Sequence, residues 1–406
     1  MGLELLAKLY SLLSDEYKNV YDRTGAESEL ITNRLEKEIK HAEKNDQIGV
    51  IIIVKELYDY AEQMNLPILL NGSANEALLF YLLGVSKCNP LPPHYLCSSC
   101  KYIEWAHELE DGMDLPLKIC PECGKVMKCD GHNIPYSGIS NTLDPTYDLR
   151  FSCVPSFIKL AKEKLRSLSN FKQICLFFEN SKNQIEITYK YYLFNENNND
   201  EYKKYYKEKL GGRKNSRVYD DFSYMSIELY PNLDTNYLSF NSLIKDHQSS
   251  FDVKKALEEI NSGHIEDIPF ISNTLIYDYI NKVGKVNVGI LIKLYSSLIS
   301  QYTEEFRPEN YLIVRKDDIK RYPSDREDVL DILKYYGLDD SDAKNTANIM
   351  RKGKDVRNKV DAASVPKANE WILEFSNNVK YLTYRAHSVS RVVFSLQAAY
   401  ARQLIK

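Results

Sequence analysis

Four cysteines occur as two C-x-x-C pairs, CSSC and CPEC, with nineteen residues between the pairs. Each pair lets two thiolates from one tight turn hold the same metal ion, and Gly124, directly after the second pair, can relieve its turn. Four soft thiolates in tetrahedral array are the ligands that structural Zn²⁺ prefers, and they leave no position open for a substrate. The sequence therefore predicts a structural zinc site, with the ligands Cys97, Cys100, Cys120 and Cys123.

Two alternatives are open for these cysteines, namely unrelated core residues and a redox dithiol. Four further cysteines are scattered along the chain, and this usage favours metal binding in a reducing cytoplasm over a disulfide framework. They are Cys88, Cys129, Cys153 and Cys175. His94 and His132 flank the zinc module, and as single histidines we expect them to be hydrogen-bonded residues rather than ligands.

The chain of 406 residues is long enough for two or three domains. Its net charge is −4, so nucleic-acid binding would have to come from local basic patches rather than from a global field. No apolar run approaches the roughly 18 residues that cross a bilayer. The N-terminus is amphipathic and carries acids, which is typical of a helix and not of a signal peptide. We expect a cytoplasmic protein without membrane contact.

Hydrophobic patterning predicts an α/β first half that carries the zinc module, followed by an all-helical second half. Residues 1–45 indicate two helices, and ALLFYLLGV indicates another. The string IGVIIIVKELYDYAE predicts a short buried strand that runs into a helix. FKQICLFFE and QIEITYKYYLF are typical of strands, whereas PSFIKLAKEKLRSL and nearly everything from about residue 250 onward have helical periodicity.

The strings around the cysteines are NPLPPHYLC, DLPLKICPECG and DGHNIPY. They closely resemble the palm region of the PolC-type DNA polymerase III alpha subunit, a C-family bacterial polymerase, whose pattern is approximately NPLPPHYVCPNCK, DLPDKNCPRCG and DGHDIPF. The strings YYGLDDSDAKNTANIMRKGK and VKYLTYRAHSVSRVVFSLQAAY resemble the helical fingers of the same family. The resemblance covers residues 29–152 and 310–406, and residues 153–310 follow it only in outline.

This resemblance implies an α/β palm of nucleotidyltransferase type with an inserted four-cysteine zinc module, followed by an all-α fingers-like domain. The expected domains are an N-terminal helix (1–28), a first palm segment (29–88), the zinc-binding module (89–135), a second palm segment with a shortened thumb-like insertion (136–250) and the fingers-like domain (251–406). A full polymerase of this type is several times longer. We expect no room here for its exonuclease, PHP domain, OB-fold or clamp-binding tail.

The family's palm strand reads PDIDLNFS, and its two aspartates project from one face and hold two divalent metal ions. The matching string here is PTYDLRFS, so Asp148 matches the second aspartate, Thr146 stands in place of the first, and Arg150 replaces an asparagine. A neutral hydroxyl cannot replace a bridging carboxylate between hard cations. The family's third carboxylate matches Glu228 in SIELYPNLD, and a glutamate facing solvent on a strand is the alternative for that residue.

The family's palm also binds the incoming triphosphate through a turn of the type GSRGSVGSS, which matches LLNGSANEA here. Gly72 and Ser73 are retained, but Asn71 stands in place of the arginine, and Glu76 and Ala77 in place of the serine pair. A carboxylate that faces a triphosphate is repulsive. The resemblance thus predicts a degenerate phosphate turn and vestigial catalytic residues, Asp148 and Glu228.

Basic strings match the places where the family's fingers approach nucleotide and template. The predicted nucleic-acid contacts in MRKGK and YRAH are Arg351, Lys352, Lys354, Arg385 and His387. Such residues bind phosphates by releasing counterions. For any single lysine the alternative is a solvated face, and this is the favoured interpretation for the basic connector over residues 203–217.

Three functions are consistent with these residues. The leading hypothesis is a truncated, catalytically defective PolC-like homologue, a pseudoenzyme that binds primer–template or single-stranded DNA, or a replisome protein, in a phage, mobile-element or defence setting. The second is an active DNA polymerase or nucleotidyltransferase that uses Mg²⁺ with Asp148, Glu228 and Asp144. The third is a scaffold that binds only protein.

Overall fold

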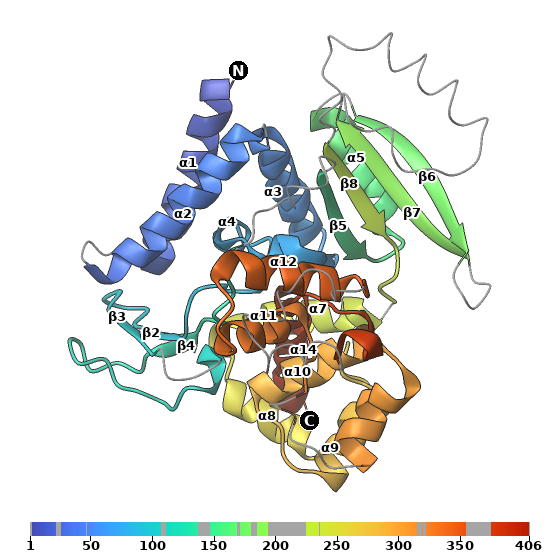
Figure 1. Cartoon of the computed structure of the whole chain (residues 1–406). Helices are drawn as coiled ribbons and strands as arrows, with labels where there is room; N and C mark the ends of the chain where they lie inside the picture. Colours follow the sequence, from blue (N-terminus) through green and yellow to red (C-terminus); the bar gives the residue numbers. More distant parts are fainter. Residues whose placement is uncertain are drawn as a thin grey trace. The chain divides into compact units, whose positions relative to one another are not determined.

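The computed structural model describes residues 2–21, 26–45, 47–106, 111–136, 147–168, 171–179, 185–193, 225–234, 236–314, 319, 322–354 and 375–405. The chain divides into two compact units, each made of two stretches of sequence. Unit 1 combines Met1–Ser86 with Pro135–Ser242, and unit 2 combines Lys87–Ile134 with Leu243–Lys406. Figure 1 labels the elements of both units. The connector over residues 203–217 lies outside the described residues.

Unit 1 begins with three helices, α1 (Gly2–Tyr21), α2 (Ala26–Lys44) and α3 (Ile48–Gln63). The first two confirm the helices expected over residues 1–45. Helix α3 contacts α1, α2 and also α5 (Phe157–Leu168). Helix α5 itself confirms the helix predicted for PSFIKLAKEKLRSL. These contacts place α3 among three neighbours, where a helix needs apolar side chains on several sides.

The strand predicted at the start of α3 is wrong. Residues 48–54 form the first two turns of the helix, although the β-branched run favours a strand in isolation. Most of the apolar side chains of α3 are buried, including Val50, Ile51, Ile52 and Val54. Packing on several sides outweighs the small helix penalty of β-branched residues. The strand lies further along the chain, at β1 (Ile68–Leu70).

A five-stranded mixed sheet, in the order β1-β5-β8-β7-β6, forms the second half of unit 1 (Figure 1). The strands after β1 are β5 (Tyr147–Cys153), β6 (Phe171–Glu179), β7 (Ile185–Leu193) and β8 (Met225–Tyr230). Strands β5 and β8 are parallel, and every other pair in this sheet is antiparallel. Strands β6 and β7 confirm the two strands predicted for FKQICLFFE and QIEITYKYYLF.

The two central strands divide their side chains between two faces. The buried residues Leu149 and Phe151 alternate along β5 with Arg150 and Ser152, and β8 alternates in the same way. Leu149 pairs with Ile227, and Arg150 pairs with Glu228, so the apolar members share one face and the polar members the other. Helix α5 contacts β6, and Figure 1 shows it running along the sheet. We call the side of Arg150 and Glu228 the polar sheet face.

A short 3₁₀ helix, η1 (Gly72–Glu76), and helix α4 (Leu78–Leu82) connect β1 to the zinc module. Buried Glu38 of α2 fixes the start of α4, because its two carboxylate oxygens accept hydrogen bonds from the backbone N–H groups of Leu78 and Leu79. Arg34 pairs with Glu38 at 2.5 Å, one turn away on the same helix. A buried carboxylate with these partners satisfies amides that a short helix would otherwise leave without acceptors.

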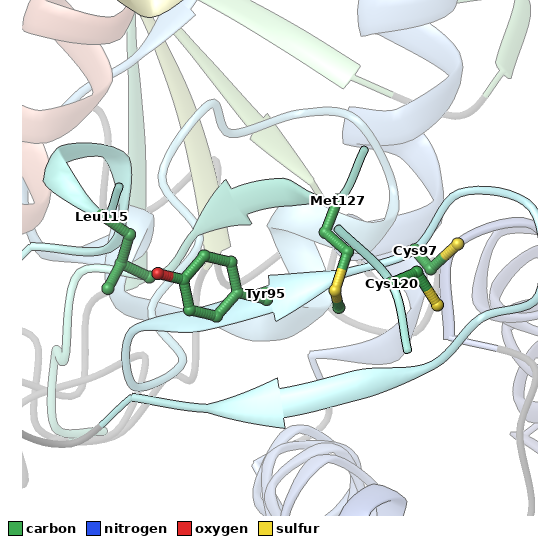
Figure 2. Packing of buried hydrophobic residues seen from close by; sticks show 5 residues of the cluster. All are labelled: Tyr95, Cys97, Leu115, Cys120 and Met127. Carbon is green, nitrogen blue, oxygen red and sulfur yellow. The ribbon is translucent and has the colours of Figure 1, made fainter. Parts of the chain in front are cut away.

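Unit 2 contains the zinc module and the helical part of the chain. A three-stranded antiparallel sheet in the order β3-β2-β4 builds the module, from β2 (His94–Leu96), β3 (Ile103–Trp105) and β4 (Lys128–Asp130). The 3₁₀ helix η2 (Gly112–Asp114) contacts β4. The module's small core consists of Tyr95, Cys97, Leu115, Cys120 and Met127, as Figure 2 shows.

The helical part of unit 2 confirms the helical periodicity expected from about residue 250. Its α-helices are α8 (Val253–Asn261), α9 (Thr274–Lys282), α10 (Val288–Ile299), α11 (Arg326–Tyr335), α12 (Asp340–Arg351) and α14 (Arg385–Ile405), preceded by α7 (Asn236–His247). Shorter elements are η4 (Gln248–Ser250), η5 (Glu304–Phe306), the π-helix η6 (Glu309–Val314) and the strand pair β9 (Gln301–Tyr302) and β10 (Val379–Tyr381). Asp or Asn side chains cap α8 to α12.

A carboxylate of the zinc module contacts the helical part. Asp114 of η2 accepts hydrogen bonds from the backbone N–H groups of Val288 and Gly289, both at 2.8 Å, at the start of α10. These hydrogen bonds satisfy backbone N–H groups at the N-terminus of α10, where Asn287 Oδ1 accepts a further one from Ile290 N. Burial raises the pKa of Asp114 to about 6. No helix in the described part of the chain has the length and hydropathy to span a bilayer.

Candidate functional site

Two matching turns present the four cysteines of the zinc module. In the first, Lys101 N donates to Cys97 O and Cys97 N donates to Tyr102 O; in the second, Gly124 N donates to Cys120 O. The residue after each pair has a left-handed backbone, with φ of 61° at Lys101 and 71° at Gly124. Glycine adopts this conformation without strain, as expected for Gly124. Each turn directs the sulfur atoms of its two cysteines toward a common point.

The sulfur atoms of Cys97, Cys100, Cys120 and Cys123 all lie within 4.8 Å of one another. Cys97 Sγ is 3.4 Å from Cys123 Sγ, and Cys100 Sγ is 3.5 Å from Cys120 Sγ. Thiolates around a tetrahedral Zn²⁺, each about 2.3 Å from the metal, stand about 3.8 Å apart. The geometry of the cluster therefore fits a metal ion such as zinc.

The two histidines of the module are hydrogen-bonded, as expected. His94 Nδ1 lies 2.7 Å from Pro92 O, and His132 Nδ1 lies 2.7 Å from Asp111 Oδ2. Burial lowers the pKa of His132, but the negative charge of the Asp111 carboxylate has the larger effect and raises this pKa above its usual value. Neither histidine belongs to the metal-ligand cluster found among the described residues.

The strands that carry Asp148 and Glu228 are neighbours on the sheet. Asp148 pairs with Ser226, and Arg150 pairs with Glu228, in the parallel register of β5 and β8. Because successive positions alternate between the two faces of a strand, position 148 shares the polar sheet face with Arg150 and Glu228. Thr146 and Asp144 lie outside the described residues, as does the side chain of Asp148.

The carboxylate of Glu228 already has a cationic partner. Glu228 is 5% exposed, and its Oε2 accepts from Arg150 Nε at 3.0 Å and from the Tyr230 hydroxyl at 2.8 Å. Arg150 remains about half exposed, so its guanidinium stands on the solvent side of the buried carboxylate. The alternative of a glutamate that faces solvent does not hold for Glu228. Sequence reasoning noted the arginine but did not foresee this pair.

The turn at Gly72 lies beside the same strand. Gly72 has a φ of 72°, and Asn71 N donates to Arg150 O at 2.7 Å. The side chain of Asn71 hydrogen-bonds to Ser152 Oγ at 3.1 Å, on the polar sheet face. Glu76, at the end of the turn, is 1% exposed. The turn that matches the family's phosphate turn is thus next to β5. At the position of the family's arginine it carries Asn71, whose side-chain amide is hydrogen-bonded to Ser152 of β5.

The predicted basic contacts of unit 2 fall into two groups. Lys352 and Lys354 are exposed at the end of α12, on either side of Gly353. A side chain at Gly353 would meet Lys380 O at 2.3 Å, so the glycine lets this turn approach β10 closely. The approach brings exposed Lys380, which the sequence did not single out, beside Lys352 and Lys354. We call these three residues the α12–β10 lysines.

Arg351, Arg385 and His387 have other surroundings. The Arg351 guanidinium lies 4.5 Å from the centre of the Tyr384 ring. Arg385 is directed at carboxylates of α11, with Nη2 2.7 Å from Asp328 Oδ1. Burial lowers the pKa of His387 well below its usual value. A role for these three residues in nucleic-acid contact stays a prediction.

The sequence comparisons agree with the resemblance. Residues 7–184 match the family model described as the bacterial DNA polymerase III alpha NTPase domain. Similar proteins include the PolC-type DNA polymerase III of Mycoplasma pneumoniae, 39% identical over 129 residues, and that of Thermotoga maritima, 36% identical over 129 residues. Each alignment covers 30% of this chain and 9% of the relative. The PolC-type enzyme of Mycoplasma genitalium is 33% identical over 161 residues, which are 36% of this chain and 11% of the relative.

These matches confirm that the chain is related to PolC-type DNA polymerase III alpha subunits. The family model extends through β5, α5 and β6 and ends just before β7. The chain spans about a tenth of the length of the relatives that it matches.

Proposed function

We propose that this chain binds DNA as a relative of the polymerase palm and fingers and does not carry out templated DNA synthesis. Unit 1 would correspond to the palm, and residues 243–406 of unit 2 to the fingers. The observation that carries the second half of this proposal is the ion pair between Arg150 and Glu228 on the polar sheet face. DNA as the ligand rests on the similarity to proteins named DNA polymerases.

The ion pair opposes the binding of divalent metal at these strands. A two-metal site needs carboxylates to offset the dehydration of the cations. Here the oxygen of Glu228 that accepts from Tyr230 also accepts from Arg150, whose guanidinium stays charged at every physiological pH. A metal ion at this carboxylate would lie a few ångströms from that positive charge, with Thr146 in place of the first carboxylate. Arg150 thus supplies, next to Glu228, the positive charge that a metal ion would otherwise supply.

The turn at Gly72 supports the same conclusion for the triphosphate. Asn71 brings no positive charge, and its amide is hydrogen-bonded to Ser152. Arg34, which lies close to the turn, donates to the backbone oxygen of Glu76 at 2.8 Å and pairs with Glu38. The described residues of the turn therefore lack a cation directed at phosphate. The α12–β10 lysines of unit 2 supply exposed positive charge for a DNA backbone instead.

The first experiment measures synthesis and binding with the same labelled primer–template. We expect no primer extension by the full chain with Mg²⁺ or Mn²⁺, and binding by fluorescence anisotropy at low salt. Replacement of Lys352 and Lys354 by glutamate is expected to weaken binding at least tenfold, because two attractive charges become repulsive. Lys344, on the same helix, pairs with Asp340 at 2.5 Å, so Lys344→Ala is the matched control and should bind as the parent does.

Two outcomes would contradict this proposal in different ways. Primer extension that disappears in Asp148→Ala would show an active polymerase. Absence of DNA binding at low salt would leave a protein partner as the target. A gain-of-function variant tests the effect of charge on metal binding directly: Thr146→Asp combined with Arg150→Asn should increase Mn²⁺ binding, measured by electron paramagnetic resonance of free Mn²⁺, over the parent chain.

A second candidate function is nucleotidyl transfer, and the register of β5 and β8 favours it. Positions 148 and 228 lie on adjacent parallel strands and on one face of the sheet, the arrangement that a metal-dependent transferase requires of its carboxylates. Incubation with labelled nucleotides and Mg²⁺ or Mn²⁺ would show transfer to DNA, RNA or protein. Loss of transfer in Asp148→Ala would support this function, and unchanged labelling would point to a contaminant. A phage, mobile-element or defence role stays a prediction.

A further inference from the structure

The outer hairpin of the zinc module holds large apolar side chains in solvent. Leu117, Ile119 and Val126 are 66%, 57% and 59% exposed, although each is close in sequence to a buried core residue. Ile119 pairs with Val126 in antiparallel fashion, and Met127 N donates to Lys118 O beside them. Leu117 is two residues from Ile119 and therefore belongs to the same side of the hairpin. We call Leu117, Ile119 and Val126 the apolar hairpin face.

These three side chains lie outside the buried core of the module. The core of the module is formed by other residues, among them Met127 and Cys120, whose side chains are buried. A contiguous exposed apolar patch on a protein surface is typical of a site of protein interaction.

The charges around the hairpin select the kind of partner. Continued pairing from Ile119 and Val126 sets exposed Lys128 opposite Leu117, at one end of the apolar hairpin face. Lys125 is exposed next to Val126, and its amine donates to the neutral hydroxyl of Ser99. Lys118 pairs with Glu104. With that pair neutral, the lysines of this hairpin outnumber the one remaining described acid, Glu122. The surroundings of the apolar hairpin face are therefore positively charged, and they favour a partner that carries carboxylates.

A second copy of the chain fits this surface poorly. In a two-fold dimer the same patch meets itself, so the positive rims of the two copies would face each other. Three side chains also offer much less than the roughly 800 Å² per partner of a stable interface. Nucleic acid fits poorly as well, because phosphates gain nothing from three apolar side chains at the centre of the surface. A short protein segment with carboxylates fits both the small area of the apolar hairpin face and the positive charge around it.

We propose that the apolar hairpin face docks a short segment of a partner protein that presents apolar side chains next to carboxylates. The two cysteines between the arms of the hairpin, Cys120 and Cys123, are zinc ligands in our assignment, so the metal holds the surface in its binding shape before the partner arrives. This site is separate from the DNA-binding lysines of α12 and β10. Failure of one proposal therefore leaves the other standing.

The test is a selection from a surface-displayed library of random 12-residue peptides against the zinc-loaded full chain. The same library is depleted on the variant Leu117→Asp, Ile119→Asn, which keeps the cysteines. We expect enriched peptides that combine at least two apolar residues with at least two acids. For one such peptide, made synthetically, Leu117→Asp should weaken binding at least tenfold by isothermal titration calorimetry, and Lys128→Glu severalfold. Equal zinc content of parent and variants shows that the module is intact.

The matched control is Tyr335→Ser, which removes an 86% exposed aromatic side chain from the end of α11 and should leave peptide binding unchanged. The proposal is overturned if no peptide is enriched over the depleted pool, if the enriched peptides carry no acids, or if Leu117→Asp binds as tightly as the parent. Sedimentation velocity identifies the other occupant: a dimer that Leu117→Asp dissociates would assign the face to a second copy. A loss of DNA affinity in Leu117→Asp would assign it to nucleic acid.

Discussion

Arg385 lies where acidic side chains of α11 converge. Its guanidinium contacts Asp328 at 2.7 Å, Asp325 at 3.4 Å and Asp331 at 3.6 Å, and its backbone N–H donates to Glu327 Oε2. Lys293 of α10 adds a second cation, 2.6 Å from Asp328 Oδ1. Although burial opposes it, the positive charge of Lys293 and Arg385 lowers the pKa of Asp328 to about 2. Arg385 thus joins the start of α14 to α11, independently of any nucleic acid.

We predict that Arg385→Ala lowers the free energy of unfolding of unit 2 by about 3–5 kcal/mol, because it leaves buried carboxylates without their cation. Lys352→Ala, on an exposed side chain, should change it by no more than about 0.5 kcal/mol. Urea denaturation of both variants at neutral pH measures the difference. If Arg385→Ala unfolds like the parent but loses DNA affinity, the prediction of nucleic-acid contact from the string YRAH is the correct one.

The pairing of Arg150 with Glu228 shows what single residues could not indicate. The sequence placed both residues in strands and identified Glu228 by its match to a family carboxylate. The two are 78 residues apart, and only the register of β5 against β8 makes them partners. Many of the residues between them, over 169–224, are those for which the resemblance is weakest. Long-range register depends on the packing of the whole sheet, which a local pattern does not contain.

At the scale of elements, we expect the zinc module to depend on a bound metal ion, because its core of five residues includes two of the four clustered cysteines. We predict one zinc per chain, and we expect Cys123→Ser to lose most of it and to lower the melting temperature of the module. Cys129→Ser is the matched control. Cys129 is a half-buried thiol in β4 that does not belong to the cluster of four sulfur atoms.

Zinc content is measured by mass spectrometry after extensive dialysis, and thermal unfolding by circular dichroism with and without EDTA. Cys129→Ser should match the parent in both measurements. Full zinc content in Cys123→Ser would contradict the assignment of four cysteine ligands.

Asp114 connects the module to α10, and its titration should appear in the stability of unit 2. Burial raises the folded pKa of Asp114 to about 6 from its usual value of 3.8. The carboxyl group therefore favours folding most when it is protonated, below pH 3.8, and this contribution is lost as the pH rises to about 6. We predict that the parent loses stability over this window relative to Asp114→Asn, which cannot titrate.

Urea denaturation at pH 4, 5, 6 and 7 measures this difference. Asp325, whose pKa burial raises to about 7, contributes in the same direction in both proteins and cancels in the comparison. Asp114→Ala should be less stable than Asp114→Asn at every pH, because it also removes the acceptor for Val288 and Gly289. Parallel curves for parent and Asp114→Asn would show that the carboxyl group titrates normally.

Most of the individual helices and strands could be predicted from the sequence, and the wrong prediction is explained by tertiary packing. Helices α1, α2, α5 and α14 were expected from periodicity, and β6 and β7 from their apolar and aromatic content. The wrong prediction, a strand at the start of α3, rested on a run of Ile and Val whose helical state depends on three neighbouring helices. The cysteine spacing identified the metal cluster because each C-x-x-C turn brings two sulfur atoms together locally, so the motif itself indicates a metal site.

At the scale of the whole molecule, a net charge of −4 limits how DNA can bind. A global field would repel DNA, so affinity has to come from local basic patches, and our proposal assigns it to the α12–β10 lysines, with Arg351 next to them. Each phosphate contact contributes about −0.9 to the slope of log affinity against log salt. Three or four contacts predict a slope between about −2.7 and −3.6, smaller in magnitude than that of a protein with an extended basic surface.

Anisotropy titrations of primer–template DNA from about 25 to about 200 mM salt give this slope. The variant with Lys352 and Lys354 replaced by alanine should lose about 1.8 from its magnitude, because two contacts disappear, whereas Lys344→Ala should keep the parent's slope. A slope steeper than about −6 would require many more cations than these, and would move the DNA-binding surface elsewhere on the chain. A parent slope that Lys352 and Lys354 do not affect would exclude the end of α12 from the interface.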